Sequence, residues 1–267
     1  MKRSDGDRAL SMVTAYDEPS ARLADAAGVD MILVGDSVGN VVLGREDTLD
    51  VTMDEMIHHT KAVIAARPSA LVVADLPWLS YHVSVDDSVR NAAALIRAGA
   101  DAVKLEGGVQ RVSVIEAIIG AEIPVMGHLG LTPQSVRAMG GFKVQGKSVE
   151  AAEHLLASAK ALEAAGCFAM VIEGVPEVLG TELTRISGIP TIGIGAGPHT
   201  DGQVLVFHDL LGLSASQSPK FVRQYADLGA IAIEALRAYV ADVQEGRFPS
   251  ESESYGASQA LSEHLEN

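Results

Sequence analysis

The sequence has very little cysteine, comparatively little basic charge and no long hydrophobic run. Its one cysteine, Cys167, excludes an internal disulfide and a cysteine-rich metal site, so nothing favours a secreted, oxidised protein and we expect a cytoplasmic one. The 20 Lys and Arg residues against 35 Asp and Glu give a formal net charge of -15, which would repel a phosphate backbone. We therefore expect no nucleic-acid partner.

Membrane insertion is not expected either. No stretch reaches the roughly 18 uninterrupted apolar residues of a membrane span. The start, MKRSDGDRAL, carries basic residues without the apolar run of a targeting signal, so we expect no leader. The acidic composition fits adaptation to high salt and equally an ordinary acidic enzyme, and the sequence leaves both open.

The length of 267 residues, 48 % of them hydrophobic, predicts one large domain. Short runs rich in Val and Ile alternate with longer segments of helical period, which is typical of parallel strands covered by helices. Eight such runs predict an α/β fold, a closed (β/α)8 barrel. The strands are expected at Met12–Ala15, Met31–Gly35, Leu71–Ala74, Ala102–Leu105, Pro124–Gly127, Ala169–Ile172, Thr191–Ile194 and Val204–Phe207. The clearest helices are expected at Thr52–Ala66, Val85–Ala98, Ser148–Ala165 and Pro219–Glu245.

A weak internal repeat supports the barrel more than the strand count does. The segments Ala26–Asp36, Arg97–Gly107 and Ala164–Gly174 share an Ala-Gly helix stop, a short strand and an acidic residue. Glycine suits the left-handed position that follows a helix. Because the segments start about 70 residues apart, which is two βα units, we expect them on alternate, even-numbered strands.

The barrel domain is predicted to occupy residues 9–248. Residues 249–267 are polar and cannot bury enough apolar area to order themselves, so they are predicted to form a flexible tail with, at most, a short helix at Leu261–Leu265.

Polar residues stand where the predicted strands end. They are Asp36, Ser37, Asp75, Lys104, Glu106, His128 and Glu173. In a parallel barrel all strand ends reach the same rim, so we expect one shared site. Each of these residues, taken alone, could equally be a scattered polar residue of the surface. Five successive strands that each end in such a residue favour the shared site.

The residue types suggest roles. Asp36, Asp75 and Glu106 offer three hard oxygen donors without cysteine, which favours Mg²⁺ over zinc. Lys104 shares a strand face with Glu106. It could pair with the metal-binding acids, hold a substrate carboxylate, form a Schiff base with a ketone, or merely neutralise buried acids. Glu173, between hydrophobic neighbours, is the candidate general base, and a turn-capping role is its alternative.

A long Gly-rich loop at Gly127–Ser148 is predicted to be a lid over a ligand. His128 within it is interpreted as a hydrogen-bond donor to the substrate rather than a metal ligand. Cys167 is interpreted as a packed thiol. The segment Gly193–Gly202 lacks the full dinucleotide fingerprint and is interpreted as a close backbone approach at the barrel rim.

Taken together, these motifs resemble the ketopantoate hydroxymethyltransferase family, in order from about Thr14 to Pro249. The GHLGLTPQSV segment followed by GGFKVQGK is the most specific part. The other matching segments are TAYD, VGDSVGN, VTMDEMIHHT, ADLPW, VKLEGG, GIGAG with TDGQVLVFHDLLGL, and PKF.

The resemblance implies a TIM barrel of the phosphoenolpyruvate/pyruvate type. It also implies a transferase that adds a hydroxymethyl group from 5,10-methylenetetrahydrofolate, or a related pterin, to 3-methyl-2-oxobutanoate. The product would be 2-dehydropantoate, on the route to pantothenate and coenzyme A. A homo-oligomer built from dimers, as in decameric relatives, is implied as well.

By the same resemblance, the magnesium positions fall on Asp36, Asp75 and Glu106, and the proton acceptor falls on Glu173. The 2-oxoacid site falls on Asp36, Ser37, Asp75 and Lys104. The expected mechanism is removal of the C3 proton by Glu173 with the enolate stabilised by Mg²⁺. The SQSPKF segment (216–221) stands where relatives carry a more Gly/His-rich loop.

Three alternatives stay open from the sequence. The first is a Mg²⁺-dependent C–C lyase or mutase of the same barrel class. The second is an aldolase that forms a Schiff base on Lys104. The third is a non-catalytic metabolite-binding barrel whose acids bind cations for stability. The identity of the one-carbon donor, the oligomeric state and feedback regulation are also left open.

Overall fold

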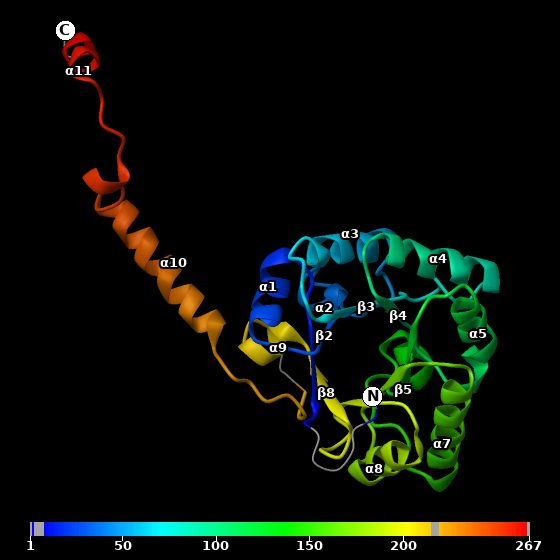
Figure 1. Ribbon diagram of the computed structural model, residues 1–267. Helices are drawn as coiled ribbons and strands as arrows, with labels where there is room; N and C mark the ends of the chain where they lie inside the picture. Colours follow the sequence, from blue (N-terminus) through cyan, green and yellow to red (C-terminus); the bar gives the residue numbers. More distant parts are fainter. Residues whose placement is uncertain (1, 3–7, 215–218, 266–267) are drawn as a thin grey trace.

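Eight parallel strands close into a barrel in chain order, with β8 paired to β1 (Figure 1). The computed structural model describes residues 2, 8–214 and 219–265. Each strand overlaps a run predicted from the sequence, which confirms the (β/α)8 barrel. The strands are β1 (Leu10–Thr14), β2 (Met31–Val34), β3 (Leu71–Asp75), β4 (Ala102–Lys104), β5 (Val125–Gly130), β6 (Ala169–Glu173), β7 (Thr191–Ile194) and β8 (Gly202–Leu205).

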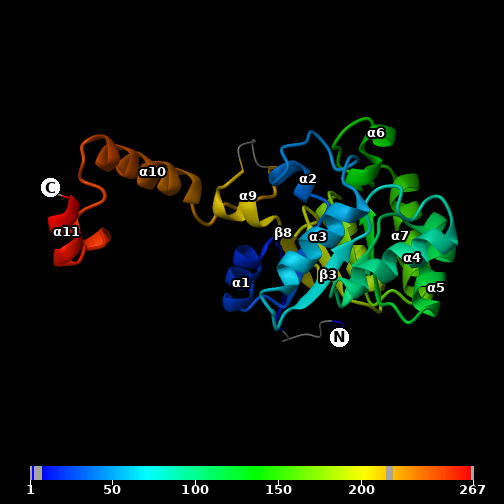
Figure 2. The same ribbon diagram turned by 90° about the horizontal axis from the view of Figure 1, so that it is seen from above.

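Helices surround the barrel on its outer side (Figures 1 and 2). The longer ones are α1 (Glu18–Ala26), α3 (Met53–Ile64), α4 (Val85–Arg97), α5 (Val112–Gly120), α7 (Val149–Ala164) and α8 (Glu177–Ile186). Shorter ones are α2 (Val38–Val41), α6 (Val136–Met139), α9 (Phe207–Leu211) and the 3-10 turns η1 (Val109–Arg111) and η2 (Pro133–Ser135). Side chains cap four helix starts, since Asp17, Thr52, Ser84 and Ser148 each accept a hydrogen bond from the third helical residue.

The core has two parts, because side chains alternate between the two faces of each strand. One face packs against the helices and includes Ile32, Val72 and Val103. The other fills the barrel interior. The interior cluster comprises Met12, Met31, Leu33, Val73, Ala102, Met126, Ala169, Val171, Ile192 and Val204.

The internal repeat falls on β2, β4 and β6, as predicted. Its glycines, Gly28, Gly99 and Gly166, have φ angles of +78°, +111° and +96°. Residues other than glycine are strained in this left-handed region, so the glycines let each helix stop and the next strand begin at once. The repeat therefore delivers three acid-tipped strands to the same end of the barrel.

Seven of the eight strands differ from the sequence prediction by one to three residues at one or both ends, and β5 and β8 differ in ways that affect the rim. Strand β5 continues to Gly130 instead of ending at Gly127, because residues as far as Gly130 pair with β6. Residues 127–130 of the predicted lid are thus strand, and the loop runs only from residue 131 to 148. Strand β8 begins at Gly202, where it pairs with Leu10, and ends before Phe207, which starts α9.

The last long helix, α10 (Leu228–Gln244), does not cover the barrel. It starts nine residues later than the predicted helix at 219–245 and projects away from the strands (Figure 1). None of its residues is buried. Beyond it lie η3 (Glu251–Glu253) and α11 (Gln259–Leu265), and the domain boundary at residue 248 stays a prediction. No helix in the described residues combines the length and apolarity that a bilayer crossing requires.

Candidate active site

The predicted site residues meet at the carboxyl end of the barrel. Six of them line one small cavity of about 100 Å³. The six are Asp36, Ser37, Asp75, Lys104, His128 and Glu173. The seventh, Glu106, is buried and lies next to His128.

Strand alternation explains why these side chains point into the barrel. Four of them lie two residues beyond an apolar residue that fills the interior, and residues two apart share a strand face. The pairs are Val73 with Asp75, Ala102 with Lys104, Met126 with His128, and Val171 with Glu173. The same periodicity that builds the core therefore builds a polar layer on top of it.

Lys104 and Asp75 form a buried ion pair. The Nζ atom of Lys104 lies 2.8 Å from Oδ1 of Asp75, and neither side chain is more than 4 % exposed. Burial would lower the pKa of Lys104, but the carboxylates of Asp75, Glu106 and Asp36 outweigh it and raise that pKa above its usual value. A protonated amine is not a nucleophile, so this geometry favours a charge-holding Lys104 over a Schiff-base lysine.

Asp36 follows β2 and lies against Asp75. Its backbone N–H donates to Oδ2 of Asp75 at 3.1 Å, and its own Oδ2 accepts a hydrogen bond from Nε2 of Gln134 at 2.8 Å. Burial, with the nearby charges of Asp75 and Glu106, holds the pKa of Asp36 well above its usual range. The positive charge of Lys104 therefore does not offset burial and the two neighbouring carboxyl groups.

His128 lies between two carboxylates. Its Nδ1 is 3.4 Å from Oε1 of Glu106, and its Nε2 is 3.2 Å from Oε2 of Glu173. Burial and Lys104 would lower the pKa of His128, but Glu106 and Glu173 outweigh them and raise it to about 9. Burial would in turn raise the pKa of Glu106, yet His128 and Lys104 bring it below the usual value.

Three buried residues beside this set were not identified from the strand ends. The hydroxyl of Tyr16 lies 2.8 Å from Oγ of Ser37. Gln134 bonds to Asp36, and the hydroxyl of Tyr81 donates to Oε1 of Gln134 at 2.5 Å. Tyr81 and Gln134 lie six and four residues beyond β3 and β5, so the strand-end criterion passed over them. Tyr16 lies two residues beyond β1, as Asp36 lies beyond β2, and was missed although the TAYD motif contains it. The GHLGLTPQSV motif contained Gln134 and was the available signal.

The donor chemistry of the site suits a divalent cation. Within residues 2, 8–214 and 219–265, no three His, Cys, Asp or Glu side chains already stand in the arrangement of a metal site. Asp75 Oδ1, although close to Lys104, receives no well-aligned hydrogen bond there. Among the seven predicted site residues, four carry carboxyl groups and two carry basic groups. The acids are Asp36, Asp75, Glu106 and Glu173, and the basic residues are Lys104 and His128. When all are ionised, two positive charges are missing, and hard oxygen donors with that deficit fit Mg²⁺.

Two larger cavities adjoin the small one. The first, about 870 Å³, shares Ser37 and Glu173 with it and is lined further out by Phe142, Lys143 and Phe221. As predicted for the Gly193–Gly202 segment, another group lies close to its backbone. The ring of Phe221 packs on Gly195, where a Cβ would lie 2.7 Å from the ring. Residues 216–218 of the SQSPKF segment lie outside the described residues.

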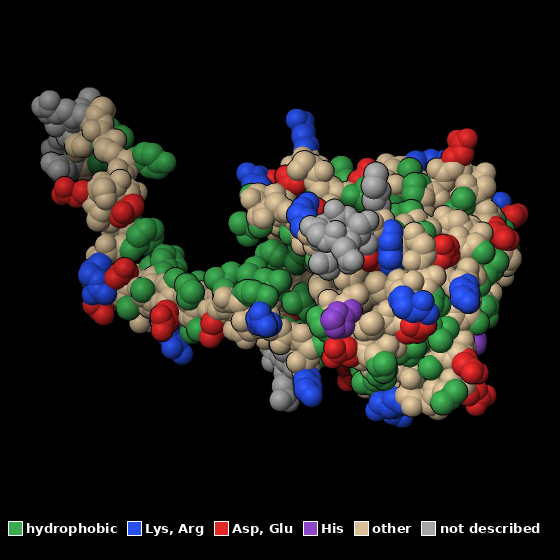
Figure 3. Space-filling view, turned by 60° about the horizontal axis from the view of Figure 1, so that its bottom comes forward, with side chains coloured by type: hydrophobic (Ala, Val, Ile, Leu, Met, Phe, Trp, Pro, Cys, Tyr) green, Lys and Arg blue, Asp and Glu red, His purple; other side chains and the backbone are tan. Residues whose placement is uncertain are grey.

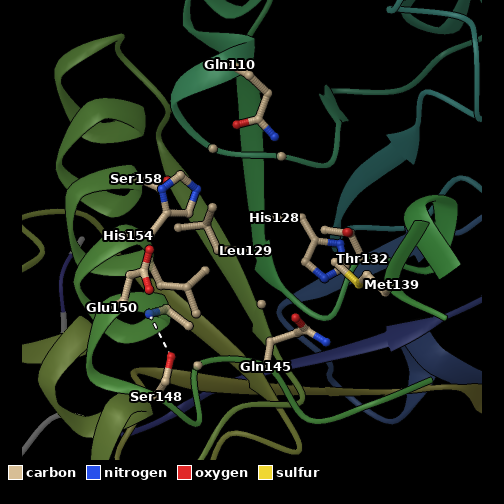
Figure 4. A pocket seen from close by; sticks show the side chains of 16 residues that line it. Gln110, His128, Leu129, Thr132, Met139, Gln145, Ser148, Glu150, His154 and Ser158 are labelled. Carbon is tan, nitrogen blue, oxygen red and sulfur yellow. Dashed lines mark hydrogen bonds between the residues drawn. The ribbon is translucent and has the colours of Figure 1, made fainter. Parts of the chain in front are cut away.

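The second cavity, about 470 Å³, lies between β5 and α7. Figure 4 shows the imidazole of His128 on one side of it and the side chains of His154 and Ser158 from α7 on the other. His128 thus belongs to the walls of both this cavity and the small one.

Comparisons with known proteins point to one family. The model of the ketopantoate hydroxymethyltransferase family matches residues 1–251. A 3-methyl-2-oxobutanoate hydroxymethyltransferase from Moorella thermoacetica is 59 % identical over 251 residues, which is 94 % of this chain and 93 % of that protein. The protein of the same name from Geotalea uraniireducens is 56 % identical over 95 % of each chain.

Solved structures with a similar fold include phosphoenolpyruvate phosphomutase from Streptomyces platensis. It has a TM-score of 0.60 and 18 % identity, and the match covers 98 % of this chain and 94 % of that one. Phosphonopyruvate hydrolase in complex with oxalate and Mg²⁺ has a TM-score of 0.60 and 15 % identity, over 93 % and 89 % of the two chains. These likenesses concern the barrel fold.

Proposed function

This chain belongs to the ketopantoate hydroxymethyltransferase family, and we propose that it transfers a hydroxymethyl group to 3-methyl-2-oxobutanoate in the cavity lined by Asp36, Lys104 and Glu173. The transferase activity is the one its close relatives are named for. The same relatives give no support to a lyase, a mutase or a non-catalytic barrel.

The observation that supports the assignment is one small cavity lined by the ion-paired Lys104 and by the carboxyl group of Glu173, which lie on different strands. Lys104 and Ser37 would hold the 2-oxoacid in register, and His128 would donate a hydrogen bond to it. Glu173 would take the proton from C3 of the substrate, so that C3 attacks the methylene carbon of the donor. A C–C bond forms, and both bonds from that carbon to N5 and N10 of the folate break. Water supplies the hydroxyl of 2-dehydropantoate, and its remaining proton and the C3 proton end on the two nitrogens, so that tetrahydrofolate leaves.

Asp36, Asp75 and Glu106 would hold Mg²⁺ through their carboxylate oxygens. The ion would polarise the ketone oxygen of the substrate and so make the C3 proton more acidic.

Replacing Asp36 with Asn should raise the Mg²⁺ concentration needed for reaction by about tenfold or more, because an ionised oxygen ligand is lost. The measurement is the loss of the C3 proton of 3-methyl-2-oxobutanoate in D₂O, followed by NMR at increasing Mg²⁺, before and after addition of 5,10-methylenetetrahydrofolate. Asp54→Asn, on α3, is the matched control. An unchanged metal titration would remove Asp36 from the ligand set, and absence of exchange in the unaltered protein would contradict the proposed function itself.

The one-carbon donor is proposed to occupy the cavity of about 870 Å³, because Glu173 and Ser37 connect it to the small cavity. Its outer walls carry the aromatic rings of Phe142 and Phe221, which suit the flat ring systems of a folate or related pterin. Phe142 lies in the loop at 131–148, so the predicted lid would act on the donor.

The projecting helix supports a homo-oligomer. Hydrophobic side chains gather along α10 (Figure 3), and Ile233, Leu236, Val240 and Val243 recur at helical spacing while 46–63 % exposed. An exposed apolar stripe of this kind marks a protein interface. We propose that a second copy of the chain covers it, since a two-fold pair presents the same stripe twice. The assembly would then be a dimer, or a decamer built from dimers.

Replacing Leu236 with Glu should shift the protein to a smaller assembly, because a charge would be buried in the interface. Sedimentation velocity measures the size directly. The control is Ala238→Glu, which lies four residues from both Glu234 and Asp242 on the acidic side of α10. An assembly of the same size in both variants would refute this interface.

A cytoplasmic location is proposed from the sequence alone. It rests on the single cysteine, Cys167, which cannot form an internal disulfide and so needs no oxidising compartment.

A further inference from the structure

We propose that Gln134, oriented by Tyr81, is a positioning residue that holds Asp36 and Glu106 in place for cation binding. The inference rests on the proposed metal role of those two carboxylates. It adds two residues that neither touch the reacting atoms nor end a strand.

Gln134 reaches both carboxylates at once. It lies in η2, directly after β5, and is 4 % exposed. Its backbone N–H donates to Oε2 of Glu106 at 3.0 Å, while its side-chain Nε2 donates to Oδ2 of Asp36 at 2.8 Å. The second Nε2 hydrogen goes to the carbonyl oxygen of Leu76 at 2.9 Å. One residue thus ties the acids that follow β2 and β4 to the segment that follows β5.

Tyr81 fixes the orientation of the side-chain amide of Gln134. Its hydroxyl, in a side chain that is 1 % exposed, accepts a hydrogen bond from the backbone N–H of Glu106 at 3.1 Å. The hydroxyl proton is therefore directed to Oε1 of Gln134, at 2.5 Å. With Oε1 occupied in this way, the NH₂ group of Gln134 must face Asp36.

The network determines which carboxylate oxygens are free. Oδ2 of Asp36 and Oε2 of Glu106 are taken by Gln134, so both are held as acceptors. Among the described residues, no hydrogen bond reaches Oδ1 of Asp36. Outer partners of this kind orient metal-binding carboxylates, and their loss commonly costs 10–100-fold in metal affinity or activity.

The test is a titration of the full chain with Mn²⁺ in the absence of substrate and donor. The EPR signal measures the concentration of free Mn²⁺ at each step. Gln134→Met keeps the side-chain length and the backbone N–H that donates to Glu106, but removes the amide that donates to Asp36 and accepts from Tyr81. The dissociation constant should therefore rise about 10–100-fold through the loss of the Asp36 contact. Tyr81→Phe leaves the Gln134 amide in place but unoriented and should give a smaller rise. Gln145→Met, in the same segment but outside this network, is the control and should bind as the unaltered protein does.

Asp36→Asn, titrated alongside, separates the two levels of the proposal. If Asp36→Asn weakens Mn²⁺ binding but Gln134→Met and Tyr81→Phe do not, the positioning role is overturned and the metal site stands. If Asp36→Asn also binds normally, the metal site fails, and the positioning role fails with it. Tyr81→Phe, which keeps the ring and its packing, decides the matter if Gln134→Met does not fold.

Discussion

Replacing Glu173 with Gln is expected to lower turnover by roughly 10²–10⁴-fold while leaving the binding of 3-methyl-2-oxobutanoate almost unchanged. The amide keeps the shape of the side chain but cannot accept the C3 proton. Glu173 ends β6, where its Oε2 lies 3.2 Å from Nε2 of His128, so a proton taken from the substrate would arrive beside an imidazole. Glu173 is also the carboxylate shared by the small cavity and the cavity of about 870 Å³ that we propose for the one-carbon donor.

The measurement that isolates this step is deuterium exchange at C3 with Mg²⁺ and no folate donor, followed by NMR. Exchange should fall by the same factor as turnover, whereas substrate affinity, measured by calorimetry, should not. Glu182→Gln on α8, whose partner is the exposed Arg185, is a matched control for the substitution. If exchange proceeds at the normal rate in Glu173→Gln, another residue is the base.

Replacing Lys104 with Met should lower the free energy of unfolding by about 3–5 kcal/mol, because it leaves Asp75 buried without its ionic partner. The two side chains are 4 % and 3 % exposed, so water cannot compensate for the lost charge. Binding of the 2-oxoacid should also weaken, since the proposed anchor for its carboxylate is lost. Chemical unfolding measures the first effect and calorimetry the second.

Lys160→Met, on the exposed side of α7, is the control and should change stability by less than about 0.5 kcal/mol. A loss of less than about 1 kcal/mol in Lys104→Met would contradict the buried ion pair. Borohydride reduction in the presence of substrate tests the Schiff-base alternative, because covalent trapping on Lys104 would show that the amine attacks the ketone.

Much of the barrel could be predicted because two local patterns repeat along the chain. Short apolar runs mark the strands, and an Ala-Gly stop before β2, β4 and β6 sets the spacing of the even strands. Since parallel strands all end at one rim, identifying the residues at their ends was enough to bring Asp75, Lys104 and Glu173 together. Strand geometry, rather than residue type, made that prediction possible.

The features that could not be predicted from the sequence depend on contacts between segments far apart in the chain. Strand β5 extends to Gly130 only because β6 lies beside it, and no local signal marks that partner. Gln134 and Tyr81 meet across 53 residues, so their hydrogen bond is visible only in the folded chain. The helix predicted at 219–245 overlaps α10, which begins only at Leu228, but the sequence did not indicate that none of its residues would be buried against the barrel.

The packed thiol of Cys167 makes the protein convenient to study with site-directed probes. Cys167 is 2 % exposed, and burial raises its pKa to about 12, so thiolate-seeking dyes should leave it untouched. As it is the one cysteine of the sequence, a new one introduced at Phe142, which is 60 % exposed beside the donor cavity, would be labelled alone. Fluorescence from that single position would then report movements of the 131–148 loop as each ligand is added.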